Sequence, residues 1–362
     1  MAELNIVSFE QALKNTNMGN RSILLGNGFS ISICKGFKYK YLYKEAQRLS
    51  AKGGSEISEV IKKIFKALNT DDFEKVLAHI NITIEIAKHY PNSKKLISAL
   101  EKDRTNLIAS FLNTISSVHP RYKSSIKTET YISCLRLLSK FNKIFTTNYD
   151  LLLYWIIMEQ KSALSNVFEL EDFDISSLPS DDGFGRGKST NGLLLWKPQH
   201  NNREQQIFYL HGSLFIIEVE DFHLKIEGNN EGYILDQLES SLISGQQPLI
   251  ILEGSSAHKA DKIGGHSYLR YCLDALKNLK GDLFLLGFSI NDKADKHIIE
   301  RIQESAVERI YIGFYENLNE DFKKKIKQLS HITSSNSERE LFVFNSKEAI
   351  QWEAIEPDTK PE

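Results

Sequence analysis

Residues 282–289 read DLFLLGFS, a continuous apolar run that ends in a glycine and a hydroxyl side chain. Two other runs have the same character, PLIILEG at 248–254 and ERIYIGFY at 308–315. Strands covered by helices on both faces are apolar along their whole length, whereas half-exposed strands alternate between apolar and polar residues. The three runs therefore predict buried strands of a parallel sheet.

Further short β-rich runs precede and follow these three, and each is succeeded by a turn and a helical pattern. Strands that alternate with helices imply βαβ units, so we expect an α/β fold with a doubly wound, mostly parallel, Rossmann-like sheet. Ligands of such sheets bind beyond the carboxyl ends of the strands. The predicted strands are 22–25, 143–146, 206–210, 248–252, 282–286, 309–313 and 341–344.

The spacing of the strands predicts one domain, at 20–345, with an insertion. Residues of approximately 45–125 show helical periodicity and no strand signal, which predicts an all-helical insertion packed against the sheet. The segment 178–202 is rich in Ser, Asp, Gly and Asn and predicts a long loop, and 346–362 predicts a tail.

Composition excludes several classes of protein. The chain has 362 residues, with 45 basic and 47 acidic side chains, and 41% of its residues are apolar. A net charge of −2 with no basic stripe argues against direct binding of nucleic acid. The longest apolar stretch, Leu151–Met158, is shorter than the ~18 residues that a membrane span needs, and the N-terminus does not resemble a signal peptide. We therefore expect a cytoplasmic protein with no membrane partner.

Cys34, Cys134 and Cys272 are the chain's cysteines, and they lie far apart. They lack the paired spacing of a zinc module, and three cysteines do not suit a disulfide framework. We expect reduced, buried thiols and no zinc.

The run GFGRGKST at 183–190 looks like a phosphate-binding P-loop at first sight. The pattern requires a glycine where Asp182 stands, and no apolar strand precedes it. A flexible loop is the better interpretation.

Four turns at predicted strand ends carry polar groups suited to a ligand. Each has a structural alternative when it is taken alone: a tight turn, a helix N-cap, a turn-forming amide or a structural histidine. Together they supply glycine amides, an amide side chain, a carboxylate and an imidazole, the groups expected at a dinucleotide site with a reactive centre. The turns are GNGFS at 26–30, TTNYD at 146–150, LHG at 210–212 and LGFS at 286–289.

The order of these elements resembles the sirtuin fold. It is most similar to bacterial sirtuin-like proteins that carry LLGNGFSI, TTNYD, YLHG and LEGSS elements, some of which are effectors of anti-phage systems, with the sirtuin-like subunit of the Kongming system as a candidate near relative. The resemblance covers roughly residues 20–330. The chain departs from classical sirtuins because it lacks the four cysteines of their zinc module and the element that follows their first glycine turn.

The resemblance implies that the chain is a zinc-free NAD glycohydrolase, which cleaves NAD to nicotinamide and ADP-ribose as a gated effector in abortive infection. NAD would be its substrate. A homo-oligomer, a regulatory partner from the same defence operon, or both, would gate the activity. The catalytic residues would be Asn148, His211 and Asp150, and the NAD-binding residues Gly26, Asn27, Gly28, Ser30, Thr147, Gly287 and Ser289.

Two alternatives stay open: a non-catalytic nucleotide-binding subunit, and a protein deacylase or ADP-ribosyltransferase. Asp292 and His297 are weaker site candidates, for which we expect helix capping and exposure to solvent, respectively. We also expect Lys259 to be an exposed helix lysine rather than a phosphate ligand.

Overall fold

The fold is taken from a computed structural model of the chain. Its description covers residues 5–52, 57–163, 178–186, 193–197, 204–227, 235, 248–252, 256–290, 294–315, 318–332 and 337–357.

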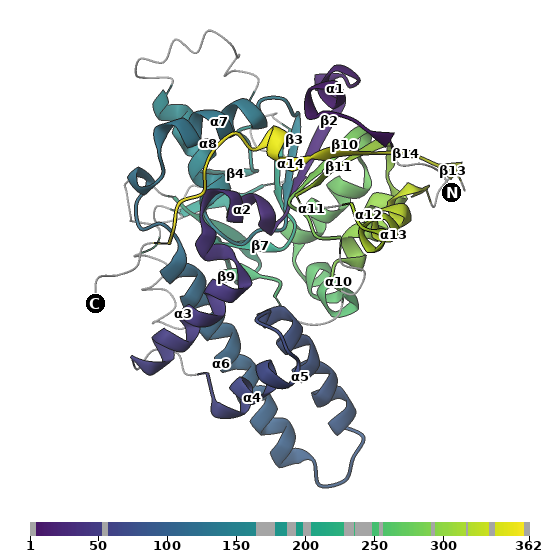
Figure 1. The fold of residues 1–362 in the computed structure, drawn as a ribbon. Helices are drawn as coiled ribbons and strands as arrows, with labels where there is room; N and C mark the ends of the chain where they lie inside the picture. The colour runs from purple at the N-terminus through teal and green to yellow at the C-terminus, as the bar shows by residue number, and fades with distance from the viewer. Residues whose placement is uncertain are drawn as a thin grey trace.

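A seven-stranded, wholly parallel sheet forms the centre of the described molecule (Figure 1). Its spatial order is β1-β14-β11-β10-β2-β3-β6. Helices flank the sheet, so the predicted doubly wound α/β fold is confirmed. The strands are β1 (Asn5–Ile6), β2 (Arg21–Leu25), β3 (Lys143–Thr146), β6 (Ile207–Tyr209), β10 (Lys280–Leu286), β11 (Ala306–Phe314) and β14 (Glu340–Asn345).

The strand order places a ligand site before any side chain is considered. Counted from β2 in chain order, the last six strands of the sheet lie in the order 3-2-1-4-5-6, which is the classic dinucleotide-binding arrangement. The order reverses between β2 and β10, whose residues Ser22–Leu25 and Leu283–Leu286 are paired and buried. The connections that follow these two strands run in opposite directions, so a crevice opens at the carboxyl ends of the two strands.

Helices cover the sheet because each buries an apolar stripe against it. The helices outside the insertion are α1 (Phe9–Lys14), α2 (Asn27–Ile33), α7 (Thr128–Leu138), α8 (Leu152–Ala163), α10 (Ser256–Gly265), α11 (Ser267–Lys277), α12 (Lys296–Glu304), α13 (Glu320–Lys327) and α14 (Ser346–Ala349). Short 3-10 turns are η1 (Met18–Asn20), η2 (Lys35–Phe37), η3 (Lys123–Ser125) and η5 (Gln328–Ser330).

The insertion is helical throughout its described part, as predicted, and projects from the sheet as a lobe (Figure 1). Ser58 and Asp72 begin two of its helices by accepting hydrogen bonds from backbone N–H groups of the first turn. Its helices are α3 (Tyr39–Ala51), α4 (Glu59–Ala67), α5 (Phe73–Ala87) and α6 (Lys94–Val118).

A second, antiparallel sheet of five strands corrects two predictions. The run 248–252 was predicted as a strand of the parallel sheet, but β9 pairs antiparallel with β7. Continuous apolar residues indicate burial on both faces and do not fix the direction of pairing. The order is β4-β5-β8-β7-β9, with β4 (Phe184–Arg186), β5 (Leu193–Trp196), β7 (Gly212–Val219), β8 (Phe222–Ile226) and β9 (Pro248–Ile250).

The predicted loop at 178–202 is therefore wrong in part, because β4 and β5 lie within it and pair with each other, and β5 also pairs with β8. Polar and glycine residues around these short strands conceal them in the sequence. Residues 187–192 and 198–202 of the segment lie outside the described part of the chain. A small hairpin, β12 (His331–Ile332) with β13 (Ser337–Glu338), completes the strands that are described.

Both ends of the predicted domain are also corrected. Before residue 20, β1 extends the parallel sheet by pairing with β14. After residue 345 the chain forms α14 and then pairs with the end of α2, where the Ile355 N–H donates to Ile33 O at 2.8 Å. Trp352 contacts Phe29 with ring centroids 6.2 Å apart. Apolar contacts thus hold a segment whose polar composition predicted a tail; residues 358–362 lie outside the description.

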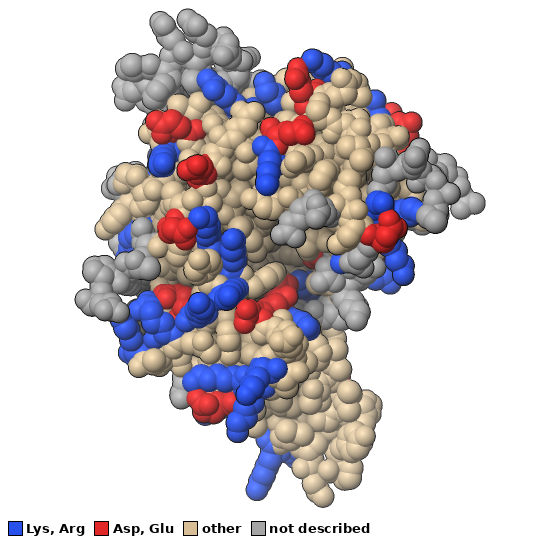
Figure 2. Space-filling view, in the orientation of Figure 1, with Lys and Arg blue, Asp and Glu red and all other residues tan. Residues whose placement is uncertain are grey.

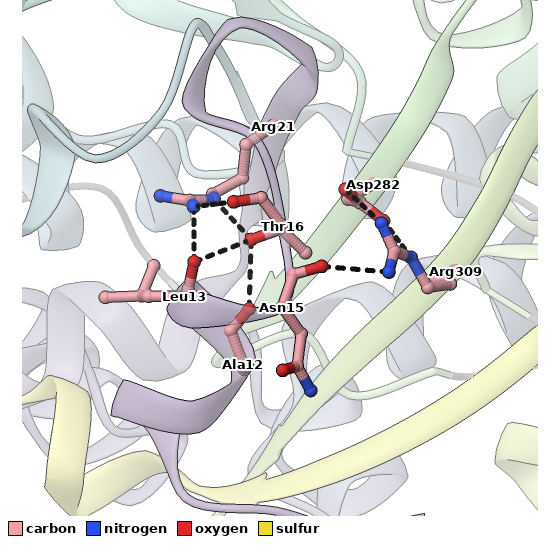
Figure 3. Close-up of polar contacts among 7 residues, drawn as sticks. All are labelled: Ala12, Leu13, Asn15, Thr16, Arg21, Asp282 and Arg309. Atoms are coloured by element: carbon pink, nitrogen blue, oxygen red, sulfur yellow. Dashed lines mark hydrogen bonds and ion pairs between the residues drawn. The ribbon is translucent and has the colours of Figure 1, made fainter.

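Charged side chains at the amino ends of the strands form hydrogen bonds that stabilise the fold (Figure 3). The buried Arg21 guanidinium, at the start of β2, donates to the backbone oxygens of Leu13 and Thr16, which close the end of α1. On the neighbouring strands, Arg309 Nε donates to Asp282 Oδ1 at 2.6 Å. These side chains stabilise the sheet at the amino ends of its strands, opposite to the crevice.

All three cysteines are buried, none in a disulfide, as predicted. Within the described residues, no helix combines the length and the apolar character that crossing a membrane requires.

Candidate functional site

A cavity of about 970 Å³ lies between the carboxyl ends of the central strands and the helical insertion. The turns after β2, β3, β6 and β10 form one wall, and side chains of α3, α5 and α6 form the other. Figure 2 shows this face of the molecule, on which basic and acidic side chains are interspersed.

Nine of the ten site residues predicted from the sequence line this single cavity. Ser30 does not line it; it is fully buried behind the wall. Because the ten residues come from four separate turns, their convergence depends on the sheet and not on proximity in the chain. The nine are Gly26, Asn27, Gly28, Thr147, Asn148, Asp150, His211, Gly287 and Ser289.

The glycine turns after β2 and β10 pack against each other, which changes the role expected for them. The Gly26 N–H donates to Leu286 O at 3.0 Å and the Gly28 N–H to Gly287 O at 2.9 Å. A Cβ on Gly287, which has φ +68°, would lie 2.4 Å from Phe29 N. The amides of Gly26 and Gly28 are engaged within the protein, so these two N–H groups are not available to a phosphate of NAD.

Asn148, Ser30 and Asp150 form a buried chain of hydrogen bonds. Asn148 Nδ2 donates to Gly26 O at 3.1 Å and to Ser30 Oγ at 2.7 Å. The Ser30 hydroxyl in turn donates to Asp150 Oδ2 at 2.5 Å, and Asp150 Oδ1 accepts from the Leu152 N–H at 2.8 Å. Ser30 is therefore a positioning residue, and both carboxylate oxygens of Asp150 serve to hold this chain in place.

The chain fixes the orientation of the Asn148 amide. Because Gly26 O can only accept, the amide nitrogen must face it, and Oδ1 must point the other way. Among the described residues Asn148 Oδ1 is buried and has no hydrogen-bond partner. A buried acceptor without a partner costs roughly 1–3 kcal/mol, so it marks a place where a ligand or a water supplies the missing donor.

His211 meets a second histidine, which sequence reasoning placed in solvent. His297 is buried at the start of α12, and its Nε2 lies 2.8 Å from His211 Nε2. On the far side of the His297 ring, Nδ1 lies 2.9 Å from Ser256 Oγ, which also accepts from the His297 N–H. The expectation of a solvated His297 is wrong because α12 turns its first residues toward the sheet.

The hydrogen-bond pattern allows one proton arrangement in which His211 keeps a free nitrogen. Ser256 Oγ accepts from the His297 N–H, and its second lone pair can accept from His297 Nδ1–H as well. His297 Nε2 then accepts from His211 Nε2–H, which leaves a free lone pair on His211 Nδ1. Nδ1 is therefore the nitrogen through which His211 can meet a ligand.

Burial lowers the pKa of both histidines, that of His297 to about 3 and that of His211 well below its usual range. The positive charge of Lys259 lowers both pKa values further. Both rings are consequently neutral at pH 7. A neutral histidine can take up a proton, which is the property needed in a general base.

The expectation for Lys259 is also wrong. It was expected on an exposed helix face, but only 1% of its surface is exposed, and its Nζ lies 2.5 Å from Glu74 Oε2. Tyr149 Oη lies 3.1 Å from Glu74 Oε1 and 3.0 Å from Ile251 O. The ion pair joins α10 to α5 of the insertion across the cavity wall.

The insertion also adds acidic groups to the cavity. Burial, and then the charge of Glu74, raise the pKa of Asp72 to about 6. Glu74 and Asp72 lie at the start of α5 and both line the cavity. Nothing in the local sequence of α5 indicates a site, since one carboxylate at a helix N-terminus is an ordinary cap. Asp292 and residues 253–255 of the LEGSS element lie outside the described part of the chain.

No curated protein matches the chain. A family profile does match it, over residues 23–352, from the third residue of β2 to the segment that follows α14. This range includes the second sheet, the helical insertion, every residue of the cavity wall named above and the parallel sheet except β1 and the first two residues of β2. The chain therefore belongs to the DUF4917 family, a domain of unknown function.

Proposed function

We propose that the chain is an NAD glycohydrolase, which hydrolyses NAD to nicotinamide and ADP-ribose in this cavity. The observation that carries the proposal is the buried, unpartnered Oδ1 of Asn148, a residue that lines the same cavity as His211. The order of the strands supports a dinucleotide in particular, because the cavity lies at the point where that order reverses.

The residues divide the reaction between them. The N-glycosidic bond breaks, nicotinamide leaves with the electron pair, and the ribose carbon becomes electron-deficient. Asn148 Oδ1 accepts a hydrogen bond from the attacking water and orients it, and the water oxygen bonds to the ribose carbon. The proton released passes to His211, whose low pKa returns it to solvent. Ser30 and Asp150 keep the Asn148 amide in place.

Three further groups shape the rest of the site. Lys259 contributes a buried positive charge that suits a diphosphate, while Glu74 keeps that charge in place. The paired glycine turns keep side chains out of the crevice, and Ser289 supplies a hydroxyl at its rim. These residues would bind the substrate without taking part in bond breaking.

Gating by a partner or by a second copy of the chain, and a role in anti-phage defence, remain predictions from the resemblance. The insertion forms one wall of the cavity, so a partner that moves α5 would change access to it. Several large apolar side chains of the lobe are exposed and offer such a partner an apolar surface, among them Ile82, Ile86, Tyr90 and Leu96.

The test is to incubate the purified chain with NAD, alone and with the proteins encoded beside it, and to measure free nicotinamide and ADP-ribose. We expect both products in equal amounts. Asn148→Ala should reduce the rate by about 100-fold or more, the loss typical of an oriented group at a reacting centre. The matched control is Asn142→Ala at the opposite edge of the sheet, where Asn142 Nδ2 donates to Gly19 O, and its rate should not change.

Each other outcome identifies an alternative. NAD that binds with no release of nicotinamide under any condition contradicts the proposal and supports a nucleotide-binding subunit. Products linked to protein, in place of free ADP-ribose, indicate transfer to an acceptor. Equal rates for Asn148→Ala and the wild type would reject the role of Asn148.

A further inference from the structure

Three potential metal ligands meet at one corner of the second sheet, away from the cavity. Glu218 lies near the end of β7, His223 lies opposite it on β8, and His266 directly precedes α11. None of the three lines the cavity. Glu218 and His223 are cross-strand partners in the hairpin, so the pairing register brings their side chains together, and the helix adds the third group.

The distances match the spacing of ligands around one ion. Glu218 Oε1 lies 3.1 Å from His223 Nε2, and Glu218 Oε2 lies 2.9 Å from His266 Nδ1. One ligand atom from each residue can be chosen so that all three lie within 4.8 Å of one another. Bonds of about 2.0–2.1 Å at tetrahedral angles place ligand atoms roughly 3.3 Å apart, so small adjustments would seat an ion.

One ligand atom of the cluster, His223 Nε2, lacks a hydrogen bond in the described part of the chain. The ring is buried, and within the described residues its Nε2 has no hydrogen-bond partner although a carboxylate oxygen is 3.1 Å away. A buried ring nitrogen beside a carboxylate oxygen, without a hydrogen bond between them, is an arrangement that a shared cation resolves.

The surroundings favour a metal on His223 in two further ways. Ser267 Oγ lies 3.4 Å from Nδ1, the other ring nitrogen, and fixes the ring from behind, as outer-shell partners of metal-bound histidines do. Trp196 and Tyr268 pack around the same ring at centroid distances of 5.9 and 6.1 Å. Glu218 and His266 are 30% and 25% exposed at their side chains, so an ion can enter from solvent.

We propose that Glu218, His223 and His266 bind one divalent transition-metal ion, zinc in particular. Two imidazoles and one carboxylate suit zinc, and water would fill the fourth position. The ion ties the β7–β8 hairpin to the start of α11 and thereby stabilises the second sheet. The cysteine spacing predicted no zinc, and it could not reveal this site, whose ligands are histidines and a carboxylate distant in the sequence.

The experiment uses the full chain, stripped of metal with a chelator and returned to metal-free buffer. Zn²⁺ is titrated in and binding is measured by calorimetry, while Co²⁺ is titrated separately to observe its visible absorption bands. We expect one Zn²⁺ per chain, a higher melting temperature with the metal, and Co²⁺ bands of a four- or five-coordinate site. Loss of an outer-shell partner typically weakens metal binding by about 10–100-fold. Glu218→Gln and His266→Gln each remove a ligand, so each should weaken Zn²⁺ binding by more than that.

Matched variants keep the proposal open to refutation. His89→Gln removes an exposed histidine of the insertion and should leave binding unchanged. The two ligand variants replace partly exposed side chains, so they should fold without metal, which circular dichroism checks. Zn²⁺ that does not bind the wild type, or that binds Glu218→Gln and His266→Gln equally well, would overturn the proposal. This result is independent of whether the chain hydrolyses NAD.

Discussion

At the scale of single residues, His297 can be separated experimentally from His211, because it contacts His211 and not the cavity. Under the proposed function it is a positioning residue: it accepts from His211 Nε2–H and so leaves His211 Nδ1 free to take up a proton. His297→Gln retains an amide oxygen that can accept from His211 Nε2, whereas His297→Ala removes the acceptor and admits water. The conservative variant should therefore preserve most of the activity.

We predict that His297→Ala lowers kcat at least about 10-fold and moves the acidic limb of the pH–rate profile to higher pH. The pKa of His211 rises in this variant because two causes that now lower it, burial and the charge of His297, are reduced. The rate of nicotinamide release from pH 5 to 9 measures both effects. A variant that lowers kcat with an unmoved profile would show that His297 has only a structural role.

Residue types at strand ends predicted the wall of the cavity well, but not how its side chains are oriented. A glycine, an amide or a histidine after a strand can be recognised in the sequence, and the sheet then brings these positions together. Lys259 and Glu74 could not be recognised, because their burial depends on α10 and α5 meeting across the cavity. Whether a helix lysine is exposed is decided by long-range packing, which local sequence does not contain.

At the scale of elements, the contact between the two glycine turns sets the geometry of the crevice. Gly287 has φ +68°, and a Cβ there would meet the backbone of Gly28 and Phe29 at less than 3 Å. Alanine at this position would have to adopt a left-handed conformation and also push α2 away from β10.

Gly287→Ala should therefore lower the free energy of unfolding by at least about 2 kcal/mol, because left-handed strain alone costs of order 1–3 kcal/mol. Its control is Gly264→Ala in α10, where an added Cβ meets nothing within 4 Å. This second variant should be neutral or stabilising by up to about 1 kcal/mol, since alanine favours helix. Urea unfolding monitored by circular dichroism compares the two, and equal stabilities would refute the argument.

The elements themselves were predicted unevenly. Strands of the parallel sheet and the long helices of the insertion follow from apolar periodicity, since each buries a regular stripe. In the second sheet, β4 and β5 were missed because they are three and four residues long, too short to show alternation among glycines and polar residues. The segment after residue 345 was missed because Trp352 and Ile355 are isolated apolar residues in a polar stretch.

At the scale of the whole molecule, buried titratable groups couple stability to pH. Burial lowers the pKa of His119 to about 4, where Nε2 accepts from the Leu151 N–H at 3.2 Å and Nδ1 contacts Pro120 O at 2.9 Å. The His211–His297 pair is neutral for the same reason. Asp72 has the opposite effect on the pH dependence of stability, because its pKa is raised to about 6.

The sign of each contribution follows from which state binds more protons. Below pH 6.5 the unfolded chain protonates His119 and the folded chain does not, so stability is complete above pH 6.5 and falls as the pH drops toward 4. The pKa difference is worth about 2 kcal/mol for His119 at pH 5. Folded Asp72 binds its proton first, so between pH 6 and 4 it adds stability as the pH falls. Asp150 and Asp282, whose pKa values burial also raises, act in the same direction as Asp72, whereas His211 and His297 act as His119 does. The largest shifts are those of the histidines, which leave a net loss.

We therefore predict that the free energy of unfolding falls by at least about 2 kcal/mol from pH 7.5 to pH 5, measured by urea unfolding at fixed ionic strength. Asp72→Asn removes one offsetting group and should make the fall steeper. His119→Gln cannot be protonated and should make it shallower, although the variant is less stable at pH 7.5. Because His89 is exposed, His89→Gln should leave the slope unchanged. A stability that stays constant or rises toward pH 5 would mean that these rings are already charged in the folded chain, and His211 would then lack the neutral form that a general base requires.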